Sequence, residues 1–174
     1  MKRYFIIYKP YKVLSSFTAS DGKATLADYF RLQKDVYGVG RLDYDSEGLL
    51  ILTNDKAFTH RLLHPSFAHE RSYLVQVEGL ITPSALKELV EGTIINIKGQ
   101  HYKTLPANAT SIAAPVHLPE RNPPVRFRKE IPDSWIRLTL KEGKNRQVRK
   151  MTASVGFPTL RLIRESIMDL HIGD

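Results

Sequence analysis

The sequence predicts an α+β fold, in which helices flank a bent, mostly antiparallel sheet. Segments with strand character outnumber segments with helical character, and the two kinds do not alternate strictly along the chain. The chain has 174 residues, of which 42% are hydrophobic, and this is enough to bury a proper core. We therefore expect a single domain over residues 1–174, and this domain could consist of two lobes.

The first half of the chain contains three expected strands and two expected helices. β-branched and aromatic residues fill the first strand, which Lys9-Pro10 ends, and hydrophobic patterning marks the other two. Thr25 and Asn54 or Asp55 are residue types that cap the start of a helix. The second helix ends at His64, because a residue before proline disfavours helical angles. The strands are expected at residues 4–8, 49–53 and 72–78, and the helices after the two caps.

The second half of the chain continues with two helices, several strands and one irregular segment. Thr82-Pro83 opens a helix that Gly92 closes, and Asn145 caps another that extends to about Val155. Four prolines interleaved with basic residues exclude a helix or a central strand between residues 119 and 132, so a basic surface loop is expected there. Short strands are expected within residues 93–118, and longer ones at 135–140 and 159–163.

The composition of the chain limits the class of protein to which it can belong and the kind of partner that it can bind. Lys and Arg number 26 against 18 acids, so the net charge is +8, which predicts a polyanionic partner. Residues 141–164 hold seven basic residues and one acid. The absence of cysteine excludes disulfides, thiolate zinc sites and cysteine nucleophiles, and it fits a cytoplasmic protein. No apolar stretch approaches the roughly 18 residues of a membrane span, so no membrane partner is expected.

Three acids, Asp43, Asp45 and Glu47, alternate directly before an apolar strand, and they allow two interpretations. In a twelve-residue calcium loop they would occupy the first, third and fifth positions, with Gly48 at the sixth. The twelfth position falls on Asn54, which cannot give the bidentate carboxylate that closes such a loop. We therefore favour an enzyme's carboxylate and expect no metal, with Asp45 and Glu47 mostly shaping the turn.

An aspartate nucleophile needs a partner that keeps it ionised in a partly dry site. A guanidinium does this, whereas burial alone raises the pKa of a carboxyl group, which then stays protonated and is not nucleophilic. The helix expected after Asn145 offers two candidates, Arg146 and Arg149. Tyr73, on an expected strand, could stack on a base and offer a hydroxyl group.

Six short motifs occur in an order that resembles the RsuA-type ribosomal RNA pseudouridine synthases. The match extends from about residue 4 to residue 168. Residues 121–126 and 152–164 resemble the E-type large-subunit branch of that family. Most members of the family carry an S4-type RNA-binding module in front, and we expect none here. The resemblance implies a pseudouridine-synthase-like catalytic domain with an active-site cleft between two lobes. The motifs are Lys9-Pro10, Gly40–Asp43, Ser46–Leu50, Arg71–Tyr73, Asn145–Met151 and Leu160–Arg164.

The same resemblance implies a role for individual residues. Asp43 would be the catalytic aspartate, Tyr73 would pack against the uracil, and Arg149 would pair with Asp43. Leu162 would form a wall of the base pocket, and Arg41 would fill the gap that the flipped uridine leaves. The remaining RNA-binding residues would come from the early Lys-Pro element, the basic loop and the basic C-terminal segment: Lys9, Arg126, Arg128, Lys144, Arg146, Lys150 and Arg161.

The expected reaction is the isomerisation of one uridine to pseudouridine in the peptidyl-transferase region of 23S ribosomal RNA. No cofactor is expected, because exchanging a C–N for a C–C bond involves no redox change. The partner would be single-stranded or locally opened RNA, and the protein would be a cytoplasmic monomer. Three alternatives stay open: a non-catalytic rRNA- or ribosome-binding protein, a synthase acting on another rRNA or tRNA site, and a metal-dependent phosphate enzyme.

Overall fold

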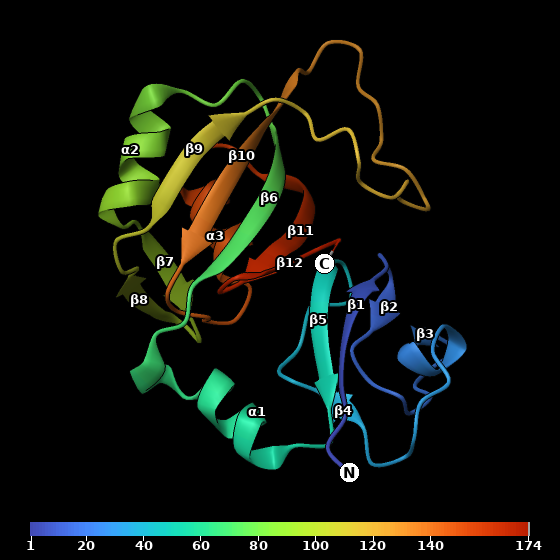
Figure 1. Cartoon of the computed structure of the whole chain (residues 1–174). Helices are drawn as coiled ribbons and strands as arrows, with labels where there is room; N and C mark the ends of the chain where they lie inside the picture. The colour runs from blue at the N-terminus through green and yellow to red at the C-terminus, as the bar shows by residue number, and fades with distance from the viewer. Residues whose placement is uncertain (174) are drawn as a thin grey trace. The chain divides into compact units, whose positions relative to one another are not determined.

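The computed structural model describes residues 1–173, which form two compact units. Unit 1 comprises residues 1–69 and the C-terminal segment from Ile163, and unit 2 comprises Glu70–Leu162. Strand β11 (Thr159–Ile167) begins in unit 2 and ends in unit 1 (Figure 1). The described strands pair mostly antiparallel and three α-helices accompany them, so the α+β expectation is confirmed. Within residues 1–173, no helix combines the length and the hydropathy that a membrane crossing requires.

Unit 1 is built around β5 (Glu47–Thr53), whose seven residues are all buried. Strand β1 (Tyr4–Lys9) lies antiparallel to it with Lys9 opposite Gly48, and β11 lies parallel to it with Ile163 opposite Glu47. The expected strands are confirmed, but β5 begins two residues earlier than the apolar run. The other elements of the unit are short: β2 (Val13–Leu14), β3 (Ala24–Thr25), η1 (Leu26–Asp28), β4 (Tyr37–Gly38), η2 (Pro65–Phe67) and β12 (Leu170–His171).

Helix α1 (Lys56–Leu63) begins and ends where the sequence predicts. The Asp55 carboxylate accepts the N–H groups of Ala57 and Phe58 at 3.0 and 3.2 Å, and the helix stops at His64, before proline. The hydroxyl of Tyr4 and the ammonium of Lys2 also bind this carboxylate, and these contacts hold the pKa of Asp55 well below its usual range. A local cap and a tertiary anchor thus meet at one residue.

Unit 2 is built on strands of the same main sheet, with helices packed on its core. Strand β10 (Asp133–Leu140) lies between β6 (Arg71–Glu78) and β9 (Asn108–Ile112), antiparallel to both. The helices are α2 (Pro83–Glu91) and α3 (Gln147–Ser154), and a hairpin is formed by β7 (Ile94–Ile97) and β8 (Gln100–Lys103). Leu89 of α2 and Met151 of α3 join Ile136 and Leu138 of β10 in one buried cluster. Thr82 and Gly92 bound α2 as expected.

The start of α3 differs from the sequence prediction. Arg146, not Asn145, is the residue before the helix, and its φ of 52° and ψ of 33° lie in the left-handed region. The turn is closed instead by Gln147, whose buried side chain accepts the N–H of Lys144 at 2.9 Å. An asparagine cap is one local solution for a helix start, and this chain uses a glutamine inside the helix. Gly156 follows the helix at φ +90°, in line with the expected stop.

Candidate functional site

The acidic loop, residues 40–47, is fixed by the segment that follows β1. The Ser15 hydroxyl donates to the carbonyl of Leu42 at 2.7 Å and accepts its N–H at 3.0 Å. The backbone N–H of Lys12 donates to the Tyr44 carbonyl at 2.8 Å, and Leu42 itself is buried in the core of unit 1. The loop therefore has one clamped and buried residue directly before Asp43.

Asp43 lies half-buried in a tight turn of this loop. Its carbonyl accepts the N–H of Ser46 at 3.0 Å, while Asp45 is also half-buried and Arg41 is exposed. A half-buried carboxylate on a clamped turn is held in position and keeps contact with water. Arg41 extends from the same loop into solvent, where a polyanion could reach it.

Gly48 directly follows the acidic loop, at a point in β5 where no side chain fits. Its φ is +107°, and a Cβ atom there would lie 2.3 Å from the carbonyl oxygen and 2.7 Å from the nitrogen of Arg164. The guanidinium of Arg164, which is buried, donates through Nε to the carbonyl of Leu49 at 2.8 Å. The close approach of β11 to β5 therefore requires glycine at this position.

The position of Glu47 differs from one expectation about the loop. The sequence assigned it to the turn, but it is the first residue of β5, only 2% of it is exposed, and it accepts a hydrogen bond from the Tyr8 hydroxyl at 3.0 Å. A carboxylate at such depth needs polar partners, because burial of an uncompensated charge is costly. Glu47 is thus part of the interior that supports the acidic loop.

The position of Lys9 contradicts a second expectation, namely that this lysine contacts RNA. Its side chain is fully buried, and its ammonium group donates to the carbonyls of Pro10 at 2.8 Å and Val13 at 2.6 Å. Burial lowers the pKa of Lys9 from 10.5 to about 8, and the charges of Glu47, Asp45 and Asp43 oppose that shift. A cation enclosed in this way cannot reach a phosphate. Lys9 instead ties the end of β1 to β2 beneath the acidic loop.

Three expected site residues belong to unit 2 and are described there. Tyr73, on β6, is half-buried, lies opposite Leu138 of β10 and packs against the core of the unit. Leu162, on β11, is buried in that core. Arg149 lies half-buried on α3. All three stand on regular elements, which hold side chains more rigidly than loops do.

The turn before α3 is organised by a glutamate that the sequence reasoning passed over. Glu142 accepts the side-chain amide of Gln147 and the backbone N–H of Leu105, both at 2.7 Å, and the hydroxyl of Tyr102. That hydroxyl contact, with burial, raises the pKa of Tyr102 to about 12. The Lys144 ammonium lies 5.1 Å from the centre of the Tyr102 ring. Lys144 and Arg146 are exposed and Lys150 is half-buried, so this turn presents cations on a fixed backbone.

The basic loop, residues 119–132, has no regular element but is pinned to the strands of unit 2. Arg121 donates to the carbonyls of Pro123 at 2.9 Å and Leu160 at 3.0 Å, and Arg161 of β11 donates to the Pro119 carbonyl at 2.7 Å. Arg128 forms an ion pair of 2.9 Å with Glu78 of β6. Arg126 is exposed. Of the cations expected to bind RNA here, Arg126 is the most available, while Arg128 and Arg161 also hold the loop.

Acidic and histidine side chains do not gather into an evident metal centre in the part of the chain that the structure describes. Among residues 1–173, no group of three or more His, Asp or Glu residues could hold a metal ion.

A family model described as RNA pseudouridylate synthase matches residues 3–154 of the chain. The chain belongs to the RNA pseudouridylate synthase family. The resemblance inferred from its motifs is confirmed, and so is the expectation of an RNA pseudouridine synthase, an isomerase. The match spans the acidic loop, Tyr73 and Arg149 together.

Named relatives of this pseudouridine synthase cover nearly all of it. Ribosomal large subunit pseudouridine synthase E of Vibrio parahaemolyticus is 49% identical over 173 residues, which make up 99% of this chain and 70% of the relative. The protein of the same name from Xanthomonas axonopodis is 48% identical over 169 residues, 96% of this chain and 86% of the relative. A solved structure described as a pseudouridylate synthase superposes with a TM-score of 0.76 at 27% identity, covering 98% of this chain and 65% of that one.

Proposed function

We propose that this pseudouridine synthase isomerises one uridine of 23S ribosomal RNA, in the peptidyl-transferase region of the large subunit. Two relatives that carry the name of a large-subunit enzyme share 49% and 48% of their aligned residues with this chain, and this supports a large-subunit substrate. A net charge of +8 favours binding to a polyanion of that kind. The choice of uridine rests on the motif resemblance to the E-type branch.

Asp43 is the proposed nucleophile, and the observation that carries this assignment is the clamped acidic loop. The Ser15 hydroxyl holds both backbone groups of Leu42, so the next residue has a fixed backbone, and the carboxylate is half-buried. Fixed position and partial desolvation are what a nucleophilic carboxylate needs. Asp45 shares the loop but lies inside the turn that Asp43 and Ser46 close, two residues after the clamped Leu42–Asp43 backbone.

In the proposed reaction the bond between ribose C1′ and uracil N1 breaks, and a bond between C1′ and C5 forms. The carboxylate of Asp43 assists departure of the base, by attack on C1′ or C6 or by elimination. The detached base rotates, C5 loses a proton and N1 gains one, so the atoms and charges of uridine and pseudouridine balance. Extraction of the uridine from its stack costs a few kcal/mol, which binding of the surrounding RNA must offset.

For the unit 2 residues we propose the roles that the family resemblance implies. Tyr73 packs against the uracil ring, Leu162 borders it, and Arg149 supplies a guanidinium that keeps the catalytic carboxylate ionised. Phosphates of the RNA bind to exposed or half-exposed cations, with affinity that falls as salt rises. These cations are Arg41, Arg126, Arg128, Lys144, Arg146, Lys150 and Arg161, and Lys9 is no longer among them.

The test compares Asp43→Asn with Asp45→Asn, which makes the same chemical change two residues away. Each variant is expressed in cells that lack this chain, and pseudouridine is mapped across 23S rRNA. We expect one modified uridine to be lost without the chain, restored by the wild type and by Asp45→Asn, and left unmodified by Asp43→Asn. RNA affinity of Asp43→Asn should stay within a few-fold of wild type. Near-normal turnover by Asp43→Asn would refute the nucleophile, and an unchanged rRNA map would refute the substrate.

A further inference from the structure

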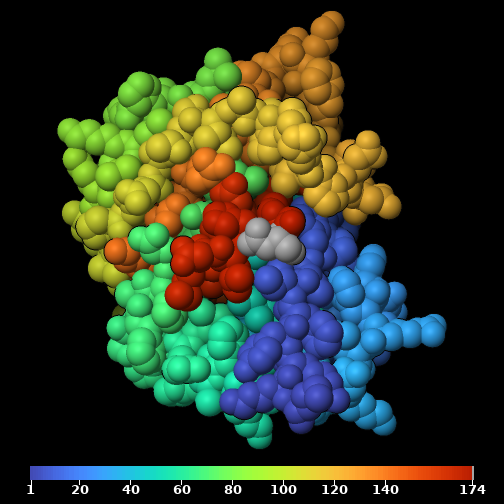
Figure 2. Space-filling view, in the orientation of Figure 1, coloured from blue at the N-terminus to red at the C-terminus, as the bar shows by residue number. Residues whose placement is uncertain are grey.

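Phe127 is the most exposed aromatic residue among the large hydrophobic side chains of residues 1–173, with 86% of its surface open. It lies in the basic loop between Arg126 and Arg128, which are themselves exposed. A phenylalanine in that position adds nothing to the core, and water solvates it poorly. In the space-filling view the end of this loop, in orange, projects at the upper edge of unit 2 (Figure 2).

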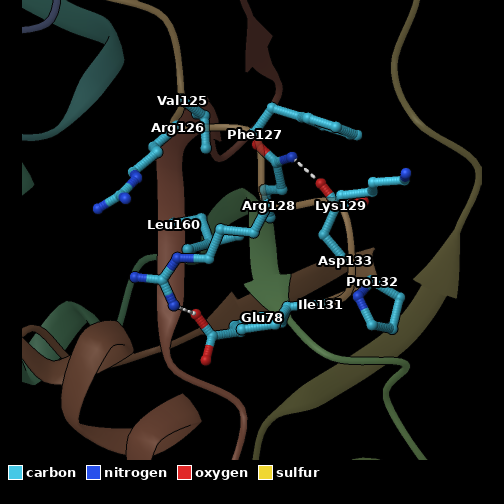
Figure 3. A pocket seen from close by; sticks show the side chains of 11 residues that line it. Glu78, Val125, Arg126, Phe127, Arg128, Lys129, Ile131, Pro132, Asp133 and Leu160 are labelled. Carbon is cyan, nitrogen blue, oxygen red and sulfur yellow. Dashed lines mark hydrogen bonds and ion pairs between the residues drawn. The ribbon is translucent and has the colours of Figure 1, made fainter.

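A pocket of about 240 Å³ adjoins Phe127 (Figure 3). Leu160, Val125 and Ile131 give it an apolar part, and polar side chains complete its wall. Cavities of about 150 Å³ accept a benzene molecule, and drug-sized ligands need about 300 Å³ or more. The pocket therefore suits one heteroaromatic ring better than a larger ligand.

Four contacts fix the segments that line the pocket. Arg128 crosses it to reach Glu78, 2.9 Å away, as Figure 3 shows. The carbonyl of Pro132 accepts the N–H of Gly79 at 2.7 Å, and Arg121 fixes the other end of the loop to Leu160. The side-chain amide of Gln76 donates to Asp133. Such a preformed site loses little entropy when a ring enters it.

The charges around Phe127 select the kind of ligand. Arg126 and Lys129 flank the ring from either side in the sequence, and both are exposed. The two carboxylates of the wall, Glu78 and Asp133, are already in contact with Arg128 and Gln76. A planar apolar face between exposed cations matches a nucleobase with a phosphate on each side. A membrane would need a larger apolar patch, and an acidic peptide would not need the aromatic ring.

We propose that the basic loop binds one unpaired nucleobase of the RNA substrate, distinct from the uridine that is modified. The base stacks on the ring of Phe127 at the mouth of the pocket, and Arg126 and Lys129 bind the adjoining phosphates. Arg128 keeps its ion pair with Glu78, which supports the loop, in addition to the phosphate contact proposed for it. The inference rests on the proposed function, since it takes RNA as the substrate, and it adds a second point of recognition away from the reacting base.

The test measures the affinity of the full-length protein for fluorescein-labelled single-stranded oligoribonucleotides of ten nucleotides, with Phe127 changed to Ala, Leu and Trp. Stacking contributes about 1–3 kcal/mol per base, so Phe127→Ala should weaken binding about fivefold or more. Phe127→Leu keeps an apolar side chain of similar size but has no π face, and it should lose as much. Phe127→Trp should bind at least as tightly as wild type. Val116→Ala, which trims a residue 83% exposed in the segment that precedes the loop, is the matched control.

A second measurement replaces single bases of the oligonucleotide with 2-aminopurine, whose fluorescence falls when it stacks. Wild type should quench this fluorescence, and Phe127→Leu should not. The inference is overturned if Phe127→Leu binds and quenches like wild type, or if Val116→Ala weakens binding equally. Melting temperatures should be unchanged in all variants, because the replaced side chains are exposed. The proposed function is judged separately by Asp43→Asn and the rRNA map: weak binding by Phe127→Ala with an unchanged rRNA map supports stacking while refuting the substrate.

Discussion

The acidic loop of unit 1 and the basic loop of unit 2 are held in place in opposite ways. The acidic loop is fixed by backbone hydrogen bonds, by the hydroxyl of Ser15 and by a buried side chain, Leu42. The basic loop is fixed by arginine side chains that donate to carbonyls and to one carboxylate. The first loop places Asp43 and Asp45 half inside the protein, and the second leaves Arg126 and Phe127 in water.

The difference follows from what each loop must do with charge. A reacting carboxylate is useful when its position is fixed and its surroundings are partly dry, because electrostatic interactions are stronger there. Cations that bind phosphates act over a longer range and need water to release counterions into. The acidic loop thus depends on backbone hydrogen bonds and one buried leucine, whereas the basic loop depends on arginine side chains at the surface. Four variants test this contrast.

Gly48→Ala should have the largest effect. The new Cβ would meet the Arg164 backbone at 2.3 Å in a left-handed conformation, so the strand pair must separate. We expect a loss of about 4 kcal/mol or more in the free energy of unfolding, and a melting temperature lower by roughly 10 °C or more. Gly99→Ala, at φ +82° with open space around it, carries the backbone strain alone and should cost only about 1 kcal/mol. Equal losses of unfolding free energy in the two variants would show that a clash with the Arg164 backbone is not the cause.

Titration of Lys9 should have the next largest effect. The pKa of Lys9 is about 8 in the folded chain and 10.5 in the unfolded chain, so between those two pH values the unfolded chain holds a proton that the folded chain has released. Stability must therefore rise with pH across that window, by up to about 3 kcal/mol. The measurement is the free energy of unfolding of wild type minus that of Lys9→Met from pH 7 to 11. A constant difference would show that Lys9 is hydrated and not buried.

Ser15→Ala should cost about 1–3 kcal/mol, because the N–H and carbonyl of Leu42 both lose their partner. Denaturant unfolding measures this loss. The loosened loop should also lower kcat for pseudouridine formation while RNA affinity stays within a few-fold of wild type. Ser16→Ala is the control, since that exposed hydroxyl has only a contact of 3.4 Å with the Thr18 carbonyl. A fall in RNA affinity without a fall in kcat would contradict the role of Ser15 as a clamp.

Glu78→Gln should have the smallest effect on stability. Its ion pair with Arg128 is partly exposed on both sides, so its loss should change the free energy of unfolding by less than about 1 kcal/mol. The freed guanidinium should steepen the dependence of RNA affinity on salt by no more than one phosphate contact, about 0.7 in the log–log slope. Glu120→Gln, an exposed carboxylate of the same loop, serves as the control. A loss of several kcal/mol in the free energy of unfolding would contradict the contrast, because it would show that the basic loop also depends on a buried contact.

Sequence reasoning succeeded where the signal is local. Asp55 and Thr82 cap α1 and α2 because a cap side chain binds N–H groups two or three residues away, so both ends of the interaction lie in one short segment. Asn145 failed as a cap because the turn before α3 depends on Glu142, whose partners include Tyr102 on another strand. The motif order identified the family, and the role of Asp43 remains a prediction that rests on it.

The amino-acid sequence was enough to predict the class of fold, nearly all of the long elements, the basic character of residues 119–132 and the family. The folded structure was needed to show that Lys9 and Glu47 are interior residues, that Gly48 has no room for a side chain, and that Arg128 has a carboxylate partner. Tyr8 and Glu47, for example, meet across 39 positions of the chain. The physical reason is that burial belongs to a place in the folded molecule: the same lysine binds phosphate on a surface and backbone carbonyls in a core.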